Sequence, residues 1–396
     1  MGPAGGPGTC GRAGVGAFTE RVKPHLTAMP ETHPVCALAQ LRDERPALRG
    51  TVALPAARIE TAAVQPRERR DDLDRAKGLG IVLVVLGHVV AREFPPGNEW
   101  FVYVKHGLYD FHMPFFMYLS GYVAFMTGAA RAAPNTWPAL FGKRAARLLV
   151  PFMIFGVAIA VGKSALASYV HMDNRPTTLL QELADLVWNT EHSVALSVWY
   201  MAVLFLLSCA TPILLWLVRG NTLLLLGLAT LVYFLPVPAV LYLNRAAMFF
   251  VFFVVGGVAA DAGRRWLDAM DRTTWASLAA LAALVCVCLV SWQIGAHLSL
   301  LVCGIVSMPA LHGLVRKRPW ARSQLLLKLG AFSLVIYLLN TPFIGLVKAL
   351  MWKVAPWDGV NFFVYLPVLL AAGIVLPILV KKWVFSRVPA IDRMTQ

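Results

Sequence analysis

The stretch DLDRAKGLGIVLVVLGHVVA, residues 72–91, has the length of a membrane-spanning helix but carries titratable groups that such a helix usually excludes. Lys77 stands at its charged edge, and His88 follows inside the apolar run. The eleven steps between them return to within about 20° of the starting direction and climb roughly 16 Å, so both side chains share one helix face. A buried imidazole indicates either a hydrogen bond to a neighbouring helix or a role in proton transfer. The second role is suited to it because a neutral imidazole is easily buried and can still take a proton.

The amino-acid composition indicates a membrane protein. Of 396 residues, 58% are hydrophobic and 14% are charged, which excludes most soluble globular proteins. The apolar residues come in blocks of about 17 to 25, long enough to cross a hydrocarbon core of roughly 30 Å. The net charge of +15 comes from basic residues between these blocks, which is typical of cytoplasmic loops. We therefore expect membrane lipid as a partner and no nucleic acid.

We predict an all-α integral membrane protein with about ten transmembrane helices around a central cavity. Basic loops lie before the first span, after the second, after the eighth and at the C-terminus, and all fall on one side if ten spans are counted. By the positive-inside rule, both termini are then cytoplasmic. The predicted spans run near 78–95, 110–128, 148–170, 195–218, 222–236, 246–263, 274–292, 295–315, 326–350 and 362–383.

Residues 1–66 have a different character from the rest of the chain. They are rich in Pro, Gly, Ala and Arg without periodicity, which predicts a disordered N-terminal extension ahead of a membrane domain at 67–390. They lack the apolar core of a secretory signal. Four of the six cysteines lie inside apolar spans, where a thiol behaves as a small apolar side chain. Their spacing does not fit zinc, so we expect no disulfide framework and no metal.

A second histidine, His112, begins the next span in the stretch YDFHMPFFMYLSGYVAF. This span follows the first outward loop, so His112 is expected near the outer end of the first helix, about 10 Å from His88 in depth. One helical hairpin would then present two imidazoles to a single cavity. Asp110 could orient or charge-pair His112, or it could be an ordinary interfacial acid.

A basic segment, GKRAARLLVPF, places three cations at the cytoplasmic mouth of the third span: Lys143, Arg144 and Arg147. Positive-inside anchoring explains them without a further role. The functional alternative is a site for a polyanion such as the phosphates of coenzyme A. Arginine forms forked hydrogen bonds to phosphate, and lysine adds a point charge.

Polar residues also mark a late span, SLVIYLLNTPF. Ser333, Tyr337 and Asn340 form one polar stripe at helical spacing, for which hydrogen bonding between helices is the plain explanation. In the second span, Ser120 and Gly121 favour close approach of a neighbouring helix.

At these residues the chain resembles the acyltransferase-3 family of integral membrane acyltransferases. The family signature is a basic residue, ten others and a histidine, with an acid three before the base; here these are Lys77, His88 and Asp74. FHMPFFMYLSGY around His112, KRAARLLVPF, SVWYMAVLF and FSLVIYLLNTPF resemble further segments of the family. The resemblance covers about residues 70–385. The signature with lysine as its basic residue is most similar to that of sugar O-acetyltransferases such as fucose 4-O-acetylases.

The resemblance implies transfer of an acyl group, commonly acetyl from acetyl-CoA, to a hydroxyl of a sugar, polysaccharide or glycolipid in a bacterial cytoplasmic (inner) membrane. His88 would act as the general base or carry the acyl group itself, and His112 would receive the acceptor or complete the transfer. Lys77 would bind phosphate or keep His88 neutral. Where many relatives carry a late histidine this sequence has Asn340, which cannot shuttle a proton near neutral pH.

Two other classes of function are compatible with parts of the pattern. In a proton-coupled transporter or flippase of a lipid-linked sugar, the histidines would relay protons. Such proteins are often built from two similar halves, and we find no second copy of the Lys–His pattern. A membrane scaffold would not need two histidines in one hairpin. Dependence on acyl-CoA separates the enzyme from both alternatives.

Overall fold

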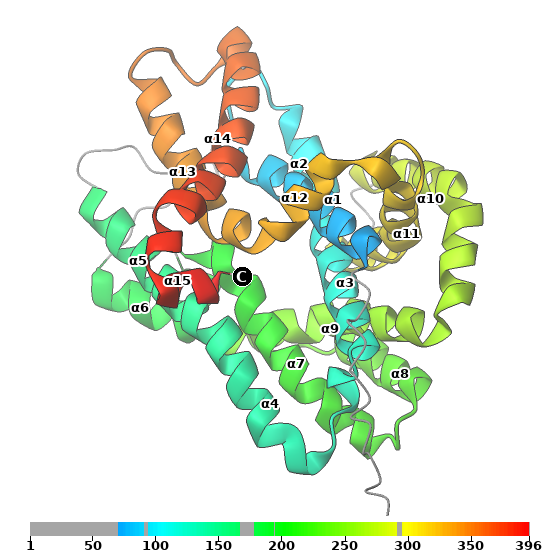
Figure 1. The fold of residues 1–396 in the computed structure, drawn as a ribbon. Coiled ribbons are helices and arrows are strands. Elements are labelled where there is room, and N and C mark those ends of the chain that lie inside the picture. The colour runs from blue at the N-terminus through cyan, green and yellow to red at the C-terminus, as the bar shows by residue number, and fades with distance from the viewer. Residues whose placement is uncertain (1–69, 91–93, 167–177, 194, 291–294, 396) are drawn as a thin grey trace, which may run out of the picture. The chain divides into compact units, whose positions relative to one another are not determined.

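The computed structural model describes residues 70–90, 94–166, 178–193, 195–290 and 295–395. The predicted extension, residues 1–66, lies outside this part of the chain. The described residues form helices and connecting segments without a strand, as predicted (Figure 1). The α-helices are α1 (Asp71–His88), α2 (Phe101–Tyr109), α3 (His112–Met126), α4 (Trp137–Arg144), α5 (Val150–Leu166), α6 (Leu179–Val187), α7 (Trp199–Leu217), α8 (Thr222–Tyr233), α9 (Leu243–Ala262), α10 (Arg264–Val290), α11 (Ala296–Arg316), α12 (Gln324–Ala331), α13 (Ser333–Trp352), α14 (Phe362–Trp383) and α15 (Pro389–Met394).

Seven helical stretches of the described chain are long and apolar enough to cross a membrane. The other three predicted spans correspond to α1, α3 and α8, of which α8 has only 12 residues and α1 carries several charges. The count of ten therefore remains a prediction. The seven stretches are Pro134–Ala165, Trp199–Leu217, Val240–Ala262, Arg264–Val290, Ala296–Arg316, Ser333–Trp352 and Gly359–Arg387.

Three of the predicted spans differ clearly from the observed helices. The span predicted at 274–292 lies in α10, which begins ten residues earlier, at Arg264. α1 begins at Asp71, before the predicted start, because acidic residues in a first turn complement the helix dipole. It ends at His88, so this histidine closes the helix instead of lying within it. The predicted span 326–350 divides at Phe332 into α12 and α13. Gly330 of α12 packs so tightly on α1 that a Cβ there would lie 1.9 Å from the carbonyl oxygen of Asp74.

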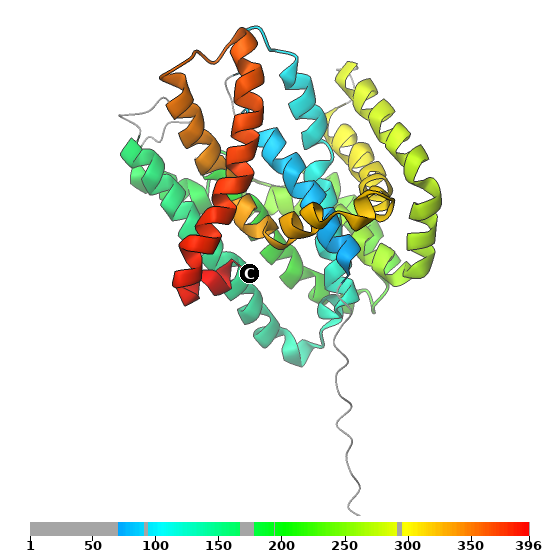
Figure 2. The same cartoon turned by 45° about the horizontal axis from the view of Figure 1, so that its top comes forward.

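Hydrogen bonds define two ends of the bundle. At one end, called the Arg70 end, the start of α1 meets the end of α11 and the start of α10. At the other, called the Trp100 end, Asn98 donates to the carbonyl of Gly359, and Trp100 stacks on Phe363 of α14. Figures 1 and 2 show α1 running between these ends beside α3, α12 and α13.

The close packing of α3 and α9 depends on glycine. A Cβ at Gly121 would lie 1.8 Å from the carbonyl oxygen of Phe253, and one at Gly256 would lie 2.2 Å from that of Tyr118. The two backbones therefore touch, which confirms the close approach predicted at Gly121. Because α3 begins with His112, this contact also fixes the helix that carries the second histidine.

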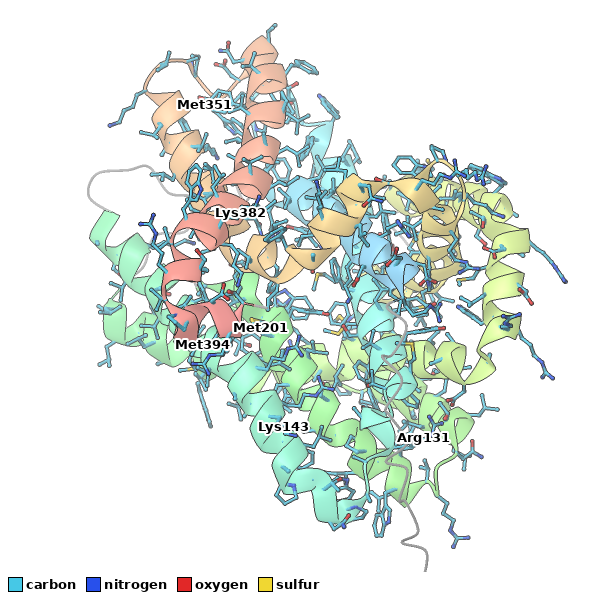
Figure 3. All side chains as sticks on the ribbon, viewed as in Figure 1. Arg131, Lys143, Met201, Met351, Lys382 and Met394 are labelled. Atoms are coloured by element: carbon cyan, nitrogen blue, oxygen red, sulfur yellow. The ribbon has the colours of Figure 1, made fainter. Side chains whose placement is uncertain are left out.

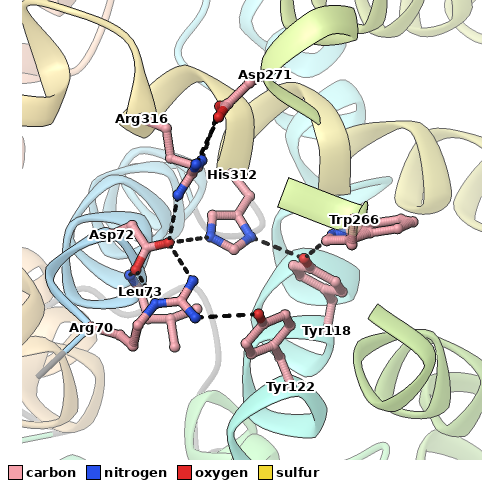
Figure 4. A network of polar contacts seen from close by, with 9 residues as sticks. All are labelled: Arg70, Asp72, Leu73, Tyr118, Tyr122, Trp266, Asp271, His312 and Arg316. Carbon is pink, nitrogen blue, oxygen red and sulfur yellow. Dashed lines mark hydrogen bonds and ion pairs between the residues drawn. The ribbon is translucent and has the colours of Figure 1, made fainter. Parts of the chain in front are cut away.

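A polar network anchors the start of α1 at the Arg70 end (Figure 4). Asp72 accepts two hydrogen bonds from Arg70, at 3.0 and 2.7 Å, and one from Arg316 of α11 at 3.2 Å. Arg316 also donates twice to Asp271 of α10, at 2.9 and 2.7 Å. These forked contacts join the start of α1 to α10 and α11, two consecutive helices much later in the chain.

The buried imidazole of His312 continues this network into the bundle (Figure 4). Trp266 donates to the hydroxyl of Tyr118 at 2.8 Å, and that hydroxyl lies 2.9 Å from Nδ1 of His312. An indole N–H can only donate, so the Tyr118 oxygen accepts from Trp266, and its own proton is available for Nδ1 of His312. Nε2 lies 3.4 Å from the carboxylate of Asp72. This separation is an ion-pair distance without hydrogen-bond geometry, and together with the Tyr118 contact it ties α1 to α3 and α11.

Candidate active site

His88, the last residue of α1, lies where the helix gives way to the connection to α2. Its Nδ1 is buried and has no hydrogen-bond partner among the described residues. The carbonyl of Gly87 accepts a hydrogen bond from the hydroxyl of Tyr109 at 3.2 Å. This side chain takes the place of a further helical turn as the partner of a terminal carbonyl, which accounts for the end of α1 at this point.

His112, the first residue of α3, is 1% exposed. Its Nδ1 lies 2.5 Å from the carbonyl oxygen of Leu108. A carbonyl only accepts, so Nδ1 carries the proton and Nε2 of the neutral ring keeps its lone pair. The hydrogen bond therefore selects the tautomer whose free nitrogen can act as a base.

Tyr109 contacts both histidines. Its ring centroid lies 6.4 Å from that of His88, edge to face, and 5.1 Å from that of His112. The two imidazoles are thus brought to one site, on opposite ends of a short aromatic chain. The sequence alone did not single out Tyr109, which ends the short helix α2 three residues before His112.

Asn340 of α13 lies beside His88. It is fully buried, and its amide donates to the carbonyls of Ile336 and Tyr337 at 2.9 and 2.7 Å. Its Oδ1, like Nδ1 of His88, has no hydrogen-bond partner among the described residues. Buried polar atoms are rarely left unsatisfied, so two on adjacent helices mark a place suited to a polar substrate group.

The remaining residues of the polar stripe have separate roles. Tyr337 accepts a hydrogen bond from the backbone N–H of Tyr200 at 3.0 Å, and Tyr200 in turn shares a 2.6 Å hydrogen bond with Ser120. The stripe on α13 therefore links α3 and α7, in line with hydrogen bonding between helices. Ser333 begins α13 and is half-buried.

The charged residues of the first hairpin are divided between the two ends. Lys77 donates to Asp74 at 3.2 Å near the Arg70 end. Asp110 accepts a 2.5 Å hydrogen bond from Ser299 of α11, which pins the turn before His112 to a third helix.

The basic segment is shaped by a local change of helix. Lys143 and Arg144 end α4, and Arg147 lies in a π-helical turn, η3 (Ala145–Leu149), that joins α4 to α5. Lys143 and Arg147 are exposed, whereas Arg144 is half-buried toward α7. π-helical turns are uncommon and often occur at functional sites. The sequence predicted the three cations but not this turn.

This arrangement supplies two candidate bases, an amide oxygen and an aromatic ring between the bases. Two cavities in the described part of the chain, one beside Arg131 and one beside Glu191, include neither His88 nor His112. The central cavity therefore remains a prediction. Among the described residues, no group of three or more His, Cys, Asp or Glu side chains is placed to hold a metal ion.

A protein-family model described as an acyltransferase domain matches residues 70–382. The chain belongs to this acyltransferase family. The matched region of the acyltransferase domain contains both histidines, Tyr109 and Asn340, and it includes nearly all of the described helices. The membership confirms the family resemblance and the class of enzyme that the resemblance implied.

Two curated relatives of the acyltransferase domain share the same name. The chain is 31% identical over 142 residues to Nodulation protein NolL of Sinorhizobium fredii, which covers 35% of this chain and 37% of the relative. It is 36% identical over 94 residues to Nodulation protein NolL of Mesorhizobium japonicum, covering 23% of this chain and 24% of the relative. The alignments thus span about a third or less of each relative. No solved structure matches the chain.

Proposed function

We propose that the protein is an integral membrane O-acyltransferase that moves an acyl group, acetyl in the first instance, from acyl-CoA to a hydroxyl of a sugar or glycolipid. The chain would cross a bacterial cytoplasmic membrane ten times, and both of its termini would lie in the cytoplasm. Family membership supports the reaction class. The observation that carries the proposal is the pair of imidazoles held around Tyr109 beside an unpartnered amide oxygen.

His88 is the general base in this proposal. Its buried Nδ1 would take the proton from the acceptor hydroxyl as the oxygen attacks the thioester carbonyl. The new C–O bond forms, the C–S bond breaks, and the imidazolium returns its proton to the thiolate of coenzyme A. His112, whose Nδ1 is committed to Leu108, would bind the acceptor through Nε2. Oδ1 of Asn340 would accept a hydrogen bond from a neighbouring acceptor hydroxyl.

The donor would enter from the Arg70 end, where basic side chains gather. Lys143, Arg144 and Arg147 would bind the phosphates of acyl-CoA, because guanidinium groups form paired hydrogen bonds with phosphate oxygens. The pantetheine arm would then extend along α1 toward His88. Lys77, held by Asp74 on the same helix face, would lie along that path.

Label transfer from radioactive acetyl-CoA to the carbohydrate and lipid fractions of membranes tests the proposal. We expect label with the wild-type protein and at least a hundredfold less with His88→Ala at equal expression, because general-base catalysis contributes about 10²–10⁴-fold. His106→Ala is the matched control, since His106 is exposed on the same hairpin. It should leave transfer unchanged.

Two results would contradict the proposal. Full transfer by His88→Ala would remove His88 from the reaction. Absence of transfer from every acyl-CoA supplied, with protein correctly inserted and all sugar fractions present, would contradict acyl transfer itself.

A further inference from the structure

A cavity of about 690 Å³ opens at the Arg70 end, away from the histidines. It lies between the end of α7 and the connection from α3 to α4, which contains the short 3₁₀ turns η1 (Ala129–Arg131) and η2 (Pro134–Thr136). The residues lining it include Arg131, Arg219 and Trp216, and none of the described lining residues is acidic. The proposed reaction at His88 does not use any of them.

Arg131 is held rigidly at the wall of this cavity. Its Nη2 donates to Asp261 at 2.8 Å and to Thr222 at 3.1 Å, and its guanidinium carbon lies 5.1 Å from the ring centroid of Phe125. These hydrogen bonds use one nitrogen of a group that has five N–H donors. A cation fixed in this way can bind an anion without first being ordered.

Arg219 and Trp216 complete the cavity from the turn after α7. Arg219 adopts a left-handed conformation, with φ of 54°, that is uncommon for a residue with a side chain. Trp216 is 60% exposed, with the edge of its ring against Trp137 of α4 at 6.3 Å. One side of the cavity therefore offers a second guanidinium and an aromatic ring.

Helix α4 leads from the neighbourhood of the cavity to the basic segment. Trp137 at the start of α4 touches Trp216 near the end of α7, and Arg144 at the end of α4 lies near Cys209, earlier in α7. Arg144 lies seven positions after Trp137 in the helix, a rise of about 10 Å. Figure 3 shows Arg131 and Lys143 at the same end of the molecule, around α4 and α7.

We propose that this cavity binds the adenosine 3′,5′-bisphosphate portion of the acyl-CoA donor, an inference that rests on the proposed function. The adenine would stack on Trp216, and the 3′-phosphate would be held by Arg131 and Arg219. The pyrophosphate would then reach Arg144, about 10 Å along α4. Ligand pockets of about 300–1,000 Å³ accommodate molecules of this size.

Direct binding of radiolabelled adenosine 3′,5′-bisphosphate to the purified full chain in neutral-lipid nanodiscs tests the assignment without requiring catalysis. We expect Arg219→Glu to weaken binding by about tenfold or more, because it replaces a charged hydrogen-bond donor to phosphate with a negative charge. Arg322→Glu is the control. Arg322 is exposed in the turn between α11 and α12, outside the cavity, and its replacement should leave binding unchanged.

A comparison of donors separates the nucleotide site from the reaction centre. Wild-type protein should prefer acetyl-CoA over S-acetyl-4′-phosphopantetheine, which lacks the adenosine bisphosphate, through a lower KM. Arg219→Glu should lose that preference while its kcat with the truncated donor stays at the wild-type value. Trp216→Leu, which keeps an apolar residue at this exposed position, should reduce the preference in the same direction.

Distinct outcomes overturn the inference and the proposed function. If wild type transfers acetyl groups but Arg219→Glu keeps full affinity for adenosine bisphosphate and the same donor preference, the nucleotide binds elsewhere. If Arg219→Glu differs from wild type in affinity for adenosine 3′,5′-bisphosphate only when anionic lipid replaces neutral lipid in the nanodiscs, the cavity binds a lipid headgroup. The inference is then wrong. If wild type binds adenosine bisphosphate at this cavity yet transfers nothing from any donor, the proposed function fails and the site assignment stands.

Discussion

Nε2 of His312 on α11 lies 3.4 Å from Oδ2 of Asp72, at the start of the helix that ends in His88. His312 is fully buried, and the Asp72 carboxylate is 13% exposed. Arg70 and Arg316 donate to the same carboxylate. Because α1 carries both Lys77 and His88, this pair acts on the candidate active site through the position of one helix.

Replacement of Asp72 by asparagine should destabilise the protein by about 2–3 kcal/mol, since it leaves two arginines and a buried imidazole without their shared counter-charge. The melting temperature in detergent measures this loss. Asp268→Asn, at an exposed position of the neighbouring helix α10, is the control and should change stability by less than about 0.5 kcal/mol. Equal melting temperatures for the two variants would show that Asp72 does not anchor α1.

The same carboxylate predicts how stability depends on pH. Burial alone would raise the pKa of Asp72, which precedes the apolar part of α1, but hydrogen bonds and charge from His312 and Arg70 hold that pKa well below its usual range. A depressed carboxylate pKa stabilises the folded state above the unfolded value of about 3.9, and this stabilisation is lost as pH falls below it. Melting temperatures between pH 7 and pH 3 should therefore fall more steeply for the wild type than for Asp72→Asn. Parallel slopes would contradict the prediction.

Tyr109 should matter for transfer through its ring more than through its hydroxyl. Tyr109→Phe keeps the contacts with His88 and His112 and loses one hydrogen bond to Gly87, so we expect less than a tenfold reduction in kcat. Tyr109→Ala removes the ring and should reduce kcat about a hundredfold, because small displacements of catalytic groups are costly. Tyr103→Ala, at an exposed position of α2, should have little effect. Similar losses in Tyr109→Phe and Tyr109→Ala would assign the effect to the hydroxyl instead.

The contact between α3 and α9 predicts a large effect of a single methyl group. Gly121→Ala would force a Cβ into the carbonyl of Phe253, so we expect a loss of at least 2 kcal/mol, on the order of other overpacked sites, and reduced transfer. Gly227→Ala, in the interior of α8 with open space around the new Cβ, is the matched control. There the better helix propensity of alanine should leave stability equal or higher. Tolerance of Gly121→Ala would mean that the two helices are not in backbone contact.

Much of the fold could be predicted because the deciding signals are local. The predicted final span, 362–383, has the same bounds as α14, and the predicted 295–315 span differs from α11 by one residue at each end. The predicted helix ends were wrong where a contact with another part of the chain decides where the helix stops. α1 ends at His88 where Tyr109 takes up a terminal carbonyl, and the span 326–350 divides near the contact between Gly330 and Asp74.

The candidate site was predicted in part for the same reason. His88 and His112 were found because each stands out within its own apolar segment. Tyr109 was missed, since a tyrosine at the end of a short helix has no local feature that distinguishes it from a packing residue. The role of Asp72 was also missed, because its partner His312 lies 240 residues later in the chain.

The sequence by itself determined the membrane class, most helix positions, the pairing of two histidines in one hairpin and the acyltransferase family, since length, hydropathy and short spacings are properties of neighbouring residues. Only the tertiary structure decided that Tyr109 contacts both imidazoles, that Asp72 joins His312, and that Arg131 and Arg219 line one cavity. These relationships depend on which helix faces meet. That choice is made by packing and hydrogen bonding over the whole bundle, because each helix alone leaves several faces that a partner could cover.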